Sequence, residues 1–206
     1  MKIGVIGVGI VGGATAKVLE KVHEMYLYDK FKPEYCSEEN LRNLVSNSEV
    51  IFICVPTPMK ITGEMDYSSV YNSIEQIIQE AVKVGKNPQD MLVVIRSTAV
   101  SGTTDKLTWK YPFRFAFNPE FLREKHAVED MENTNRVVIG ANDEKSSSQL
   151  KSIYEPIFPN AHYIIVTRKE AEMIKYAANV TLASQIAIAN EIYQICQATG
   201  ISYETI

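Results

Sequence analysis

The sequence predicts an α/β fold, a Rossmann-like doubly wound and mainly parallel sheet followed by one long α-helix. Three observations lead to this fold class. Apolar runs of strand length alternate with longer helical patterns as far as residue 166, which is typical of repeated βαβ units. A glycine-rich turn directly follows the first apolar run, and the last forty residues form one uninterrupted helical pattern.

The predicted strands are short, mostly apolar runs bounded by polar or turn residues. They cover residues 2–6, 25–29, 50–55, 91–95, 113–117, 136–139 and 163–166. The predicted helices between them carry apolar side chains at helical spacing. They cover residues 10–21, 37–46, 67–84, 103–109 and 144–154, and Asp66 is expected to cap the third of them.

The last helix is predicted to begin at the capping box of Thr167-Arg168-Lys169-Glu170 and to end near Thr199, with Gly200 as its stop. Seventeen of the twenty-six positions from 171 to 196 are apolar, which is too many for one stripe. We therefore expect this helix to be covered on more than one side, by a second subunit or by a further domain. The chain is predicted to divide into a Rossmann domain, residues 1–166, and a long helical region, residues 167–206, that serves dimerisation or contact between domains.

Composition argues against several function classes. A chain of 206 residues suits one large domain with an appendage, and its net charge of −4 lacks the basic excess of a nucleic-acid binder. No run in the sequence reaches the ~18 apolar residues of a membrane span. The cysteines Cys36, Cys54 and Cys196 form no CxxC pair, which argues for the reducing cytoplasm and against a disulfide framework or a metal site.

The glycine-rich turn Gly7-Val8-Gly9-Ile10-Val11-Gly12 opens the first helix and predicts a dinucleotide site. Its first glycine makes the tight turn, the second lets the backbone approach a pyrophosphate, and the third lets helix and strand pack closely. Asp29, twenty-two positions after Gly7, is placed to accept hydrogen bonds from an adenosine ribose diol. Its carboxylate would repel a 2′-phosphate, and the positive charge of the neighbouring Lys30 offsets this repulsion only in part. NAD is therefore favoured over NADP.

Two further segments follow later strands at the same predicted edge of the sheet, where the second half of a dinucleotide site belongs. Val55-Pro56-Thr57-Pro58 leaves Thr57 as the polar group available to a ligand, because the prolines stiffen the loop. Ser97-Thr98 follows the fourth strand, and Ser101-Gly102-Thr103-Thr104 then begins a helix whose free N–H groups could face an anion.

A pair of acids follows the fifth predicted strand. Asn118 and Pro119 are suited to the cap and first turn of a helix, on which Glu120 and Glu124 would share one face. Such a pair suits proton transfer or the positioning of a water, although an acidic first turn is also a common structural feature.

The long helix carries three polar side chains, Glu172, Lys175 and Asn179, at helical spacing among apolar residues. Solvated polar residues would be the simplest explanation. The apolar density around them favours instead a polar site held by the helix.

Five segments, in family order, resemble the nucleotide-sugar dehydrogenase family, typified by UDP-glucose 6-dehydrogenase and GDP-mannose 6-dehydrogenase. They are GVGIVG, VPTP followed by Gly63 and Asp66, RSTAVSGTT, FNPEFLREKHAVEDMENTNRVVIG and EAEMIKYAANVTLASQIAIANEI. The resemblance implies NAD-dependent oxidation of a sugar C6 alcohol to a carboxylate, through an aldehyde-level and a thioester intermediate, as in polysaccharide biosynthesis. It also implies a UDP- or GDP-sugar substrate and a homodimer formed through the helix of residues 168–199.

The resemblance also assigns roles to residues of this chain. Contacts with NAD are implied for Gly7, Val8, Gly9, Ile10, Val11, Gly12, Asp29, Lys30, Val55, Pro56, Thr57, Pro58, Met59, Ser97, Thr98, Ala99 and Glu124. Contacts with the sugar nucleotide are implied for Glu120, Phe121, Leu122, Arg123, Glu124, Lys175 and Asn179. The implied catalytic set is Thr98, Glu120, Lys175 and Asn179. Within it, Thr98 and Glu120 would manage water and protons, and Lys175 would stabilise the developing oxyanion at C6.

The sequence departs from the family in several places. Ile10, the pair Val100-Ser101 and Lys125 stand where relatives usually have an aromatic residue, a proline pair and a small residue. The connection between the second and third predicted strands is shorter than in relatives. Part of the wall around the adenosine is therefore expected to be missing.

Relatives carry a nucleophilic cysteine in a glycine-rich loop after the central helix, followed by a second α/β domain that binds the nucleotide. Neither occurs before Ile206, and none of the three cysteines fits that role on motif grounds. The chain is therefore expected to be the NAD-binding half of such an enzyme. The alternatives are a stand-alone or vestigial NAD-binding module and a different Rossmann dehydrogenase, such as a 3-hydroxyacid dehydrogenase, against which the segment NPEFLRE speaks.

Overall fold

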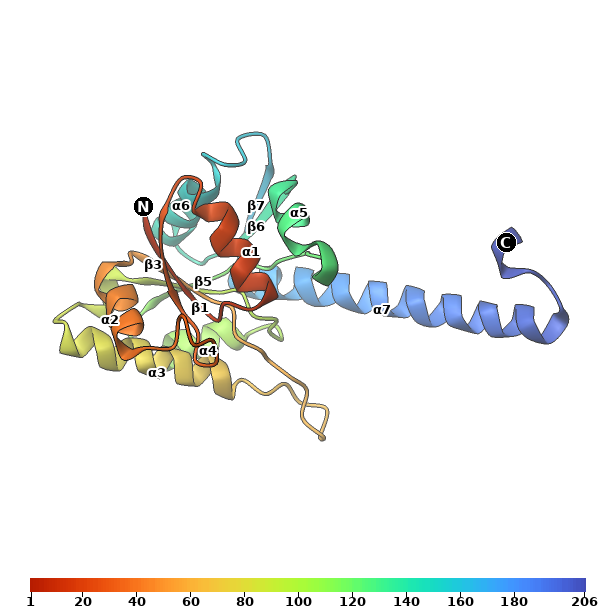
Figure 1. Cartoon of the computed structure of the whole chain (residues 1–206), viewed down its shortest axis with the longest axis horizontal. Helices are drawn as coiled ribbons and strands as arrows, with labels where there is room; N and C mark the ends of the chain where they lie inside the picture. Colours follow the sequence, from red (N-terminus) through yellow and green to blue (C-terminus); the bar gives the residue numbers. More distant parts are fainter.

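The computed structural model describes all 206 residues and contains one seven-stranded sheet (Figure 1). The strand order is β2-β1-β3-β4-β5-β6-β7. Neighbouring strands are parallel except β5 and β6, which are antiparallel and pair where Phe117 meets Gly140. The strands are β1 Lys2–Ile6, β2 Glu24–Tyr28, β3 Val50–Ile53, β4 Leu92–Ile95, β5 Arg114–Phe117, β6 Arg136–Gly140 and β7 His162–Val166. The predicted fold class is confirmed, and each predicted strand overlaps an observed one.

The helices are α1 Ile10–Leu19, α2 Glu38–Asn47, α3 Ser68–Lys83, α4 Thr103–Lys110, α5 Ala127–Glu132, α6 Glu144–Tyr154 and α7 Arg168–Thr199. Short 3-10 helices cover Pro88–Asp90, Glu124–His126 and Tyr203–Thr205. The helices predicted over residues 10–21, 37–46, 67–84, 103–109 and 144–154 are all present, and α5 is an addition. The carboxylate of Asp66 accepts a hydrogen bond from the Ser68 backbone N–H at 2.9 Å, so it satisfies one N–H of the first turn of α3, although the N-cap position itself is held by Tyr67.

Helices cover both faces of the sheet, which makes the fold doubly wound. Buried side chains of α2, α3 and α4 form one apolar cluster with alternate strand residues such as Ile51 and Ile53. Those of α1, α5 and α6 form the second cluster with the strand residues between them, such as Val50 and Phe52. Because both faces of the central strands are buried, those strands are apolar throughout, as the sequence runs required.

The prediction that a helix begins at Asn118 is wrong. Residues 118–123 have no regular secondary structure, and a 3-10 helix begins only at Glu124. The side-chain N–H of Asn118 donates to the Val138 carbonyl at 2.8 Å, and its Oδ1 accepts from the Tyr154 hydroxyl at 2.6 Å. This side chain is thus used to hold the segment beside β6 and has no oxygen free to cap a helix. Glu120 and Glu124 consequently do not share a helical face.

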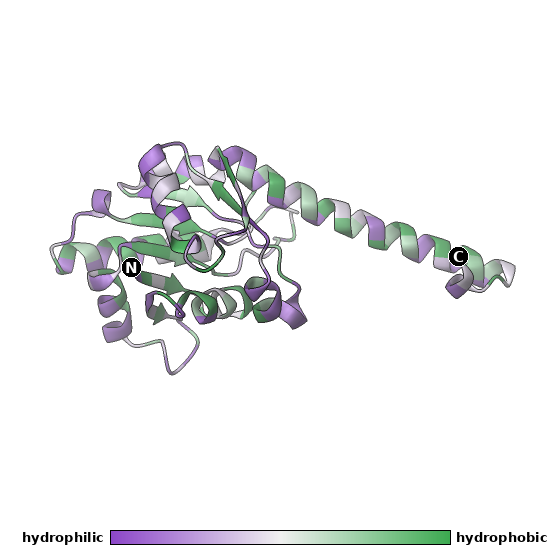
Figure 2. Ribbon diagram, turned by 90° about the horizontal axis from the view of Figure 1, so that it is seen from above, coloured by the Kyte–Doolittle hydropathy of each residue, from purple (hydrophilic) through white to green (hydrophobic).

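The long helix α7 begins with the predicted capping box, in which Thr167 and Glu170 satisfy each other's backbone N–H groups. It ends at Gly200, whose φ of 74° lies in the left-handed region that glycine adopts without strain. Figure 2 shows the helix projecting far beyond the sheet domain. Most of it is exposed in this chain, so the cover expected from a second subunit or a further domain stays a prediction.

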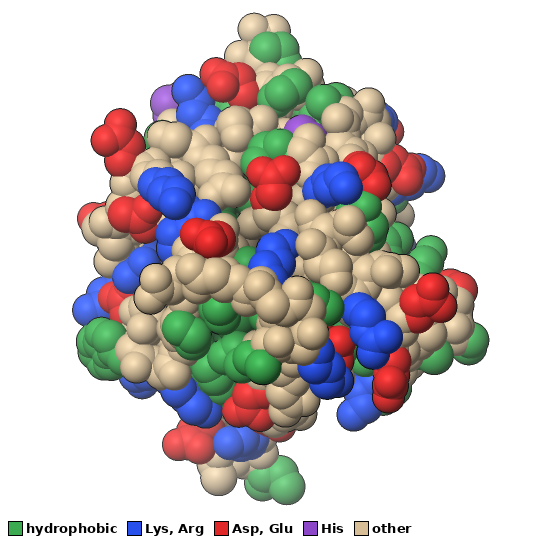
Figure 3. Space-filling model, turned by 90° about the vertical axis from the view of Figure 1, so that its left-hand side faces the viewer, with side chains coloured by type: hydrophobic (Ala, Val, Ile, Leu, Met, Phe, Trp, Pro, Cys, Tyr) green, Lys and Arg blue, Asp and Glu red, His purple; other side chains and the backbone are tan.

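The outer surface of the sheet domain, seen from the side opposite α7, carries intermingled basic and acidic side chains (Figure 3). No field of one charge sign gathers over this face. None of the helices is both long and apolar enough to cross a membrane.

Candidate functional site

The glycine-rich turn between β1 and α1 has the geometry of a pyrophosphate site. Gly7 has a φ of 89°, and a Cβ on Gly12 would lie 1.9 Å from the Gly7 carbonyl oxygen, so neither position accepts a side chain. A Cβ on Gly9 would meet nothing within 4 Å, which leaves the outside of the turn open. No side chain caps α1, so its first N–H groups remain available to an anion.

Asp29 ties the end of β2 to this turn. One carboxylate oxygen accepts the Val8 N–H at 2.7 Å, and the other accepts the Phe31 N–H at 2.8 Å. Each oxygen keeps a further lone pair, so the same carboxylate can still accept bonds from a ribose diol. The Val8 N–H, by contrast, is already committed to Asp29 and is not free for a pyrophosphate.

Two pockets adjoin the turn. The outer pocket, of about 350 Å³, lies between β2 and α3, and the inner pocket, of about 440 Å³, lies over the ends of β1, β3 and β4. They share five lining residues, Gly7, Asp29, Phe31, Val55 and Pro56. Two adjoining pockets that meet at the glycine turn suit the two halves of a dinucleotide.

The outer pocket includes residues that the sequence reasoning missed. Ser69, Asn72 and Gln76 line it from α3, and Phe31 lines it from the loop after β2. The signal was present in the sequence, because Ser69, Asn72 and Gln76 recur at helical spacing on the polar side of α3. The connection after β2 supplies part of the wall of this pocket, with Lys30 and the exposed Phe31 in it.

The inner pocket brings together Thr57, Ser97, Thr98 and Glu120, as the sequence predicted. Their hydroxyls are partly used within the chain. Ser97 donates to the Val55 carbonyl at 2.6 Å, and Thr57 donates to the Thr98 carbonyl at 3.0 Å. The Thr57 hydroxyl proton is therefore committed, while its oxygen can still accept a bond from a ligand.

Several residues predicted to contact the cofactor do not line either pocket. They are Val8, Gly12, Pro58, Met59 and Ala99. Glu124 lines another pocket, of about 440 Å³, between α1 and α5, where it lies with Ile10 at the start of α1. It is exposed on the 3-10 helix that precedes α5.

The N-terminus of α4 does not face a free anion site, and that expectation is wrong. Glu172 of α7 fills it: one carboxylate oxygen accepts the Gly102 N–H at 2.5 Å, and the other accepts the Thr104 N–H at 2.7 Å. The Thr104 hydroxyl also donates to Glu172, at 2.6 Å. The chain's own carboxylate thus occupies the position predicted for a ligand.

Lys175 and Glu120 form a nearly buried ion pair beside the inner pocket. The Lys175 Nζ donates to Glu120 Oε1 at 2.8 Å, and the two side chains are 8% and 13% exposed. The second oxygen of Glu120 accepts the Leu122 N–H at 2.7 Å, and the ring of Phe121 lies 5.5 Å below the ammonium group. Asn179 is exposed one turn farther along α7 and joins neither residue. The expected polar face of the helix is therefore buried at Glu172 and Lys175 only.

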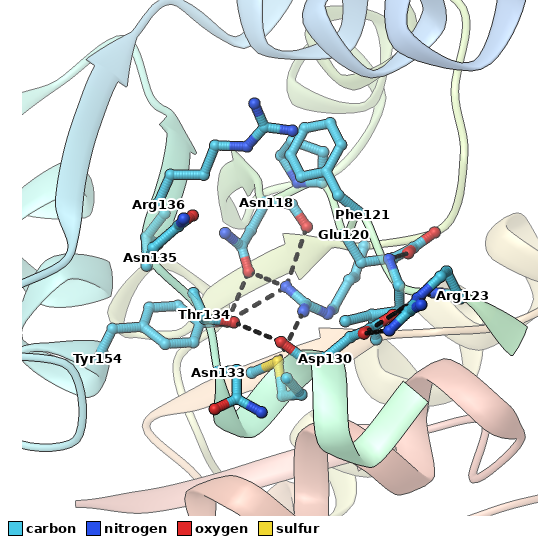
Figure 4. A pocket seen from close by; sticks show the side chains of 15 residues that line it. Asn118, Glu120, Phe121, Arg123, Asp130, Asn133, Thr134, Asn135, Arg136 and Tyr154 are labelled. Carbon is cyan, nitrogen blue, oxygen red and sulfur yellow. Dashed lines mark hydrogen bonds and ion pairs between the residues drawn. The ribbon is translucent and has the colours of Figure 1, made fainter. Parts of the chain in front are cut away.

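A fourth cavity, of about 500 Å³, lies beside the 118–123 segment (Figure 4). Arg96, 5% exposed, lines it and donates to the Asn118 side chain and to the Tyr154 hydroxyl. Burial raises the pKa of Tyr154 to about 12, so its hydroxyl stays protonated. Arg123 pairs with Asp130 at 2.7 Å, and this pairing lowers the pKa of Asp130 to about 2. The sequence offered no signal for Arg96 beyond its place at the end of a buried strand.

The three cysteines are free and lie in different surroundings. Cys36 is exposed, Cys196 is buried near the end of α7, and Cys54 lies at the end of β3 beside the inner pocket. Burial raises the pKa of the Cys54 thiol to about 12. No group of three or more His, Cys, Asp or Glu side chains is placed to hold a metal ion.

Comparison with known families matches two parts of the chain. Residues 30–158 match the NAD binding domain of the UDP-glucose/GDP-mannose dehydrogenase family. Residues 169–206 match the central domain of the same family. The second match begins one residue after the start of α7.

Similar proteins of known name agree with these matches. The UDP-glucose 6-dehydrogenase of Rickettsia bellii is 38% identical over 162 residues, which are 76% of this chain and 36% of the relative. The solved structure of a ternary complex of GDP-mannose dehydrogenase from Pseudomonas aeruginosa superposes with a TM-score of 0.85 at 28% identity, over 100% of this chain and 55% of that one. A UDP-glucose dehydrogenase from Pyrobaculum islandicum gives a TM-score of 0.84 at 28% identity, over 98% and 54%. The chain thus spans between a third and about half of the length of these relatives.

Proposed function

The chain belongs to the UDP-glucose/GDP-mannose dehydrogenase family, and we propose that it is the NAD-binding half of an enzyme that oxidises a nucleotide sugar at C6 from alcohol to carboxylate. One observation carries this proposal: the glycine turn and Asp29 lead through the inner pocket to Glu120, which pairs with Lys175. A dinucleotide site and a proton-handling ion pair therefore lie side by side. Because the matches extend through residues 169–206, a complete enzyme is favoured over a stand-alone NAD-binding module.

The residues at the turn fit NAD, the cofactor of the family's matched domain. In the proposal, the open face at Gly9 and the uncapped start of α1 bind the pyrophosphate, and Asp29 accepts bonds from the ribose diol. Phe31 and Pro56 border both pockets and would enclose the adenosine end. When bound, NAD supplies the acceptor for the hydride from the sugar. Thr57, Ser97 and Thr98 would orient that acceptor within the inner pocket.

The protein side of the chemistry rests on the buried ion pair. A cation at Lys175 would stabilise negative charge that develops on the C6 oxygen, because the ion pair that holds it is nearly buried. Glu120, 2.8 Å from Lys175, would hold or take a proton, and Thr98 would help to position a water in the same pocket. Asn179 would contact the sugar from the next turn of α7, and residues 120–124 would line its other side.

The remaining parts of the site are proposed to come from polypeptide other than these 206 residues. The thioester stage needs a reactive thiolate, and the Cys54 thiol does not fit because its pKa is raised to about 12. We propose that the chain divides at residues 166 and 167 into a Rossmann domain and the long helical region. The nucleotide would be recognised by a domain that follows this region in the family.

Three further properties belong to the proposal. Exposed apolar side chains along α7 support a homodimer formed through the helix of residues 168–199. The absence of any disulfide among the three cysteines supports a cytoplasmic location. The sugar acid that the reaction yields would serve polysaccharide biosynthesis.

The proposal is tested by following NADH absorbance with UDP-glucose and with GDP-mannose. The 206-residue chain alone is expected to bind NAD and to reduce it negligibly, because binding energy from the nucleotide normally positions the sugar for hydride transfer. Saturable turnover by the chain alone would contradict the division of parts described above.

When the chain is mixed with the missing half of the enzyme, turnover is expected to appear. Lys175→Ala should then abolish that turnover while leaving NAD affinity nearly unchanged. Failure of the unaltered chain to bind NAD at all would reject the proposed function.

A further inference from the structure

Glu172 is the most deeply buried acid in the chain, and it has no cation beside it. Glu172 is 0% exposed, and no lysine, arginine or histidine forms an ion pair with it. A carboxylate in such a place is strongly disfavoured unless hydrogen-bond donors replace its water. The donors come from the first turn of α4, through the three bonds from Gly102 and Thr104. The positive end of the α4 dipole adds to their effect.

These three bonds fix the position of α7 along its axis relative to the start of α4. Two neighbouring contacts fix the same junction: the Ser101 hydroxyl donates to the Lys169 carbonyl at 3.0 Å, and Arg168 pairs with Asp105 at 2.7 Å. Close packing limits the other side, because a Cβ on Gly140 would lie 2.5 Å from the Ala171 Cβ. The first two turns of α7 are therefore held by directional contacts from several elements.

Lys175 lies three residues after Glu172, so both side chains lie on the same face of the helix, one turn apart. A shift or rotation of α7 that broke the bonds of Glu172 would also move the Lys175 ammonium relative to Glu120. That ammonium makes a single directional contact, at 2.8 Å. Glu172 makes three, so the acid is the better-fixed of the two side chains.

The other end of the Glu172 contact leads to the inner pocket. Gly102 is four residues after Thr98, and the segment between them is fixed elsewhere by Tyr67, whose hydroxyl accepts the Val100 N–H at 2.9 Å. Thr57 donates to the Thr98 carbonyl from the opposite side. Glu172 thus connects the segment that carries Thr98 directly with the helix that carries Lys175.

We propose that Glu172 is a positioning residue, whose carboxylate at the α4 N-terminus sets the register of α7 so that Lys175 meets Glu120 beside the Thr98 segment. The proposal rests on the function proposed for Lys175, Glu120 and Thr98. The physical claim can be tested without catalysis: removal of the Glu172 carboxylate should free the Lys175 ammonium from its contact with Glu120.

The test measures how fast a small amine-reactive acylating reagent modifies Lys175. The rate is obtained by mass spectrometry of the peptides from the 206-residue chain. In Glu172→Ala we expect the rate at Lys175 to rise by at least about fivefold, the factor that corresponds to losing one typical helix cap. Added formate should enter the vacated position at the α4 N-terminus and return the rate toward that of the unaltered chain. Lys17, an exposed lysine on α1, serves as the internal reference.

Glu170→Ala is the matched control. Glu170 is also a carboxylate in the first turn of α7 that accepts backbone and hydroxyl donors, but its partners are in Thr167 and not in α4. Its replacement destabilises the helix start without touching the α4 junction, so Lys175 labelling should stay within twofold. Glu172→Gln covers the case in which the alanine variant fails to fold. It keeps the volume but turns an amide N–H₂ toward the donors of α4, and it should also raise the Lys175 rate.

Three outcomes would overturn the proposal: an unchanged Lys175 rate in both Glu172 variants, an equal rise in Glu170→Ala, or a Glu172→Ala rate that does not respond to formate. Titration of NAD on the unaltered chain separates this proposal from the proposed function. Loss of NAD binding there would reject the function, while the labelling result would still decide the role of Glu172.

Discussion

The first two turns of α7 and the turns beyond Tyr176 differ sharply although they belong to one helix. The first two turns carry the three residues of the helix start that are buried, Ala171, Glu172 and Lys175, each in contact with another element. Beyond them the helix projects from the sheet domain and leaves its apolar side chains exposed, with Ile186 at 64% (Figures 1 and 2).

The difference shows that apolar content alone does not decide which part of a helix is buried in the chain. The buried turns meet the end of β6 and the start of α4, where glycines allow close approach and backbone N–H groups donate hydrogen bonds to a carboxylate. The projecting turns are more apolar, but no other part of the sheet domain extends far enough to reach them. Their exposed surface is consistent with a partner, whereas the first turns already have their partners in the chain.

The largest effect on the free energy of unfolding is expected from filling the space between β6 and the first turn of α7. In Gly140→Ala, the new Cβ would lie 2.5 Å from the Ala171 Cβ and 3.1 Å from the Arg168 Cα. The first turn of α7 must then move away from β6, at a cost of about 2 kcal/mol in the free energy of unfolding. Denaturant unfolding followed by circular dichroism measures this cost.

Gly13→Ala is the control for that substitution. Its Cβ would meet only the Val8 carbonyl oxygen, at 3.8 Å, and the residue lies within α1. Better helix propensity should leave the free energy of unfolding equal or higher by up to roughly 1 kcal/mol. If both alanine variants had the same unfolding free energy as the unaltered chain, the close packing of α7 on β6 would be contradicted.

A smaller effect on stability, but a large one on assembly, is expected from the projecting end. Ile186→Asp places a charge on an exposed apolar position, so the unfolding free energy of the single chain should change by less than about 0.5 kcal/mol. The self-association proposed for α7 should be lost, because a buried unpaired carboxylate is strongly disfavoured. Sedimentation should then give the mass of one chain in place of two.

Gln185→Asp adds the same charge at the neighbouring exposed position and serves as the control. It should change the mass less than Ile186→Asp does. A single-chain mass for the unaltered protein at tens of micromolar would argue against the dimer.

The smallest structural disturbance uses the cysteines as reporters. At pH 8 an alkylating reagent should modify Cys36 rapidly and Cys54 slowly, because burial raises the pKa of the Cys54 thiol to about 12 and the reactive thiolate is scarce. Cys196 is covered near the end of α7, where the neighbouring segment after Gly200 is exposed, so fraying there should give an intermediate rate. Mass spectrometry of the alkylated peptides measures all three rates, and equal rates for Cys54 and Cys36 would contradict the raised pKa of the half-buried Cys54 thiol.

The pH dependence of the Cys54 contribution follows from the same shift. The folded pKa is raised above that of the unfolded chain, so the contribution to stability is complete below the ordinary thiol pKa. It should diminish as the pH rises from that value toward 12, because only the unfolded chain ionises there. Cys54→Ala should remove this part of the pH dependence.

The sheet was predictable because periodicity and turn chemistry agree along most of the chain. Runs such as residues 50–55 are apolar at every position. Gly7, Asp29 and Thr167 stand at a tight turn, a strand end and a helix cap, where each residue type has a recognisable local role. The cofactor turn could be found in this way since all its parts lie within thirty residues.

Three features could not be predicted because they depend on contacts between distant segments. Asn118 and Pro119 have the local signature of a helix start, but the contacts of Asn118 with Val138 and Tyr154 outweigh it. Likewise, nothing near Thr104 in the sequence shows that Glu172, sixty-eight positions later, takes its N–H group. The side-chain network around Arg96 has the same origin.

The central claim, that this chain binds NAD through the glycine turn and Asp29, is tested most directly by calorimetric titration with NAD and with NADP. The carboxylate of Asp29 would repel a 2′-phosphate, so NAD should bind at least about tenfold more tightly. Asp29→Asn retains an acceptor for the Val8 N–H and removes the charge, and it should narrow the difference between the two cofactors. Binding of NADP as tight as that of NAD, or tighter, would contradict the claim.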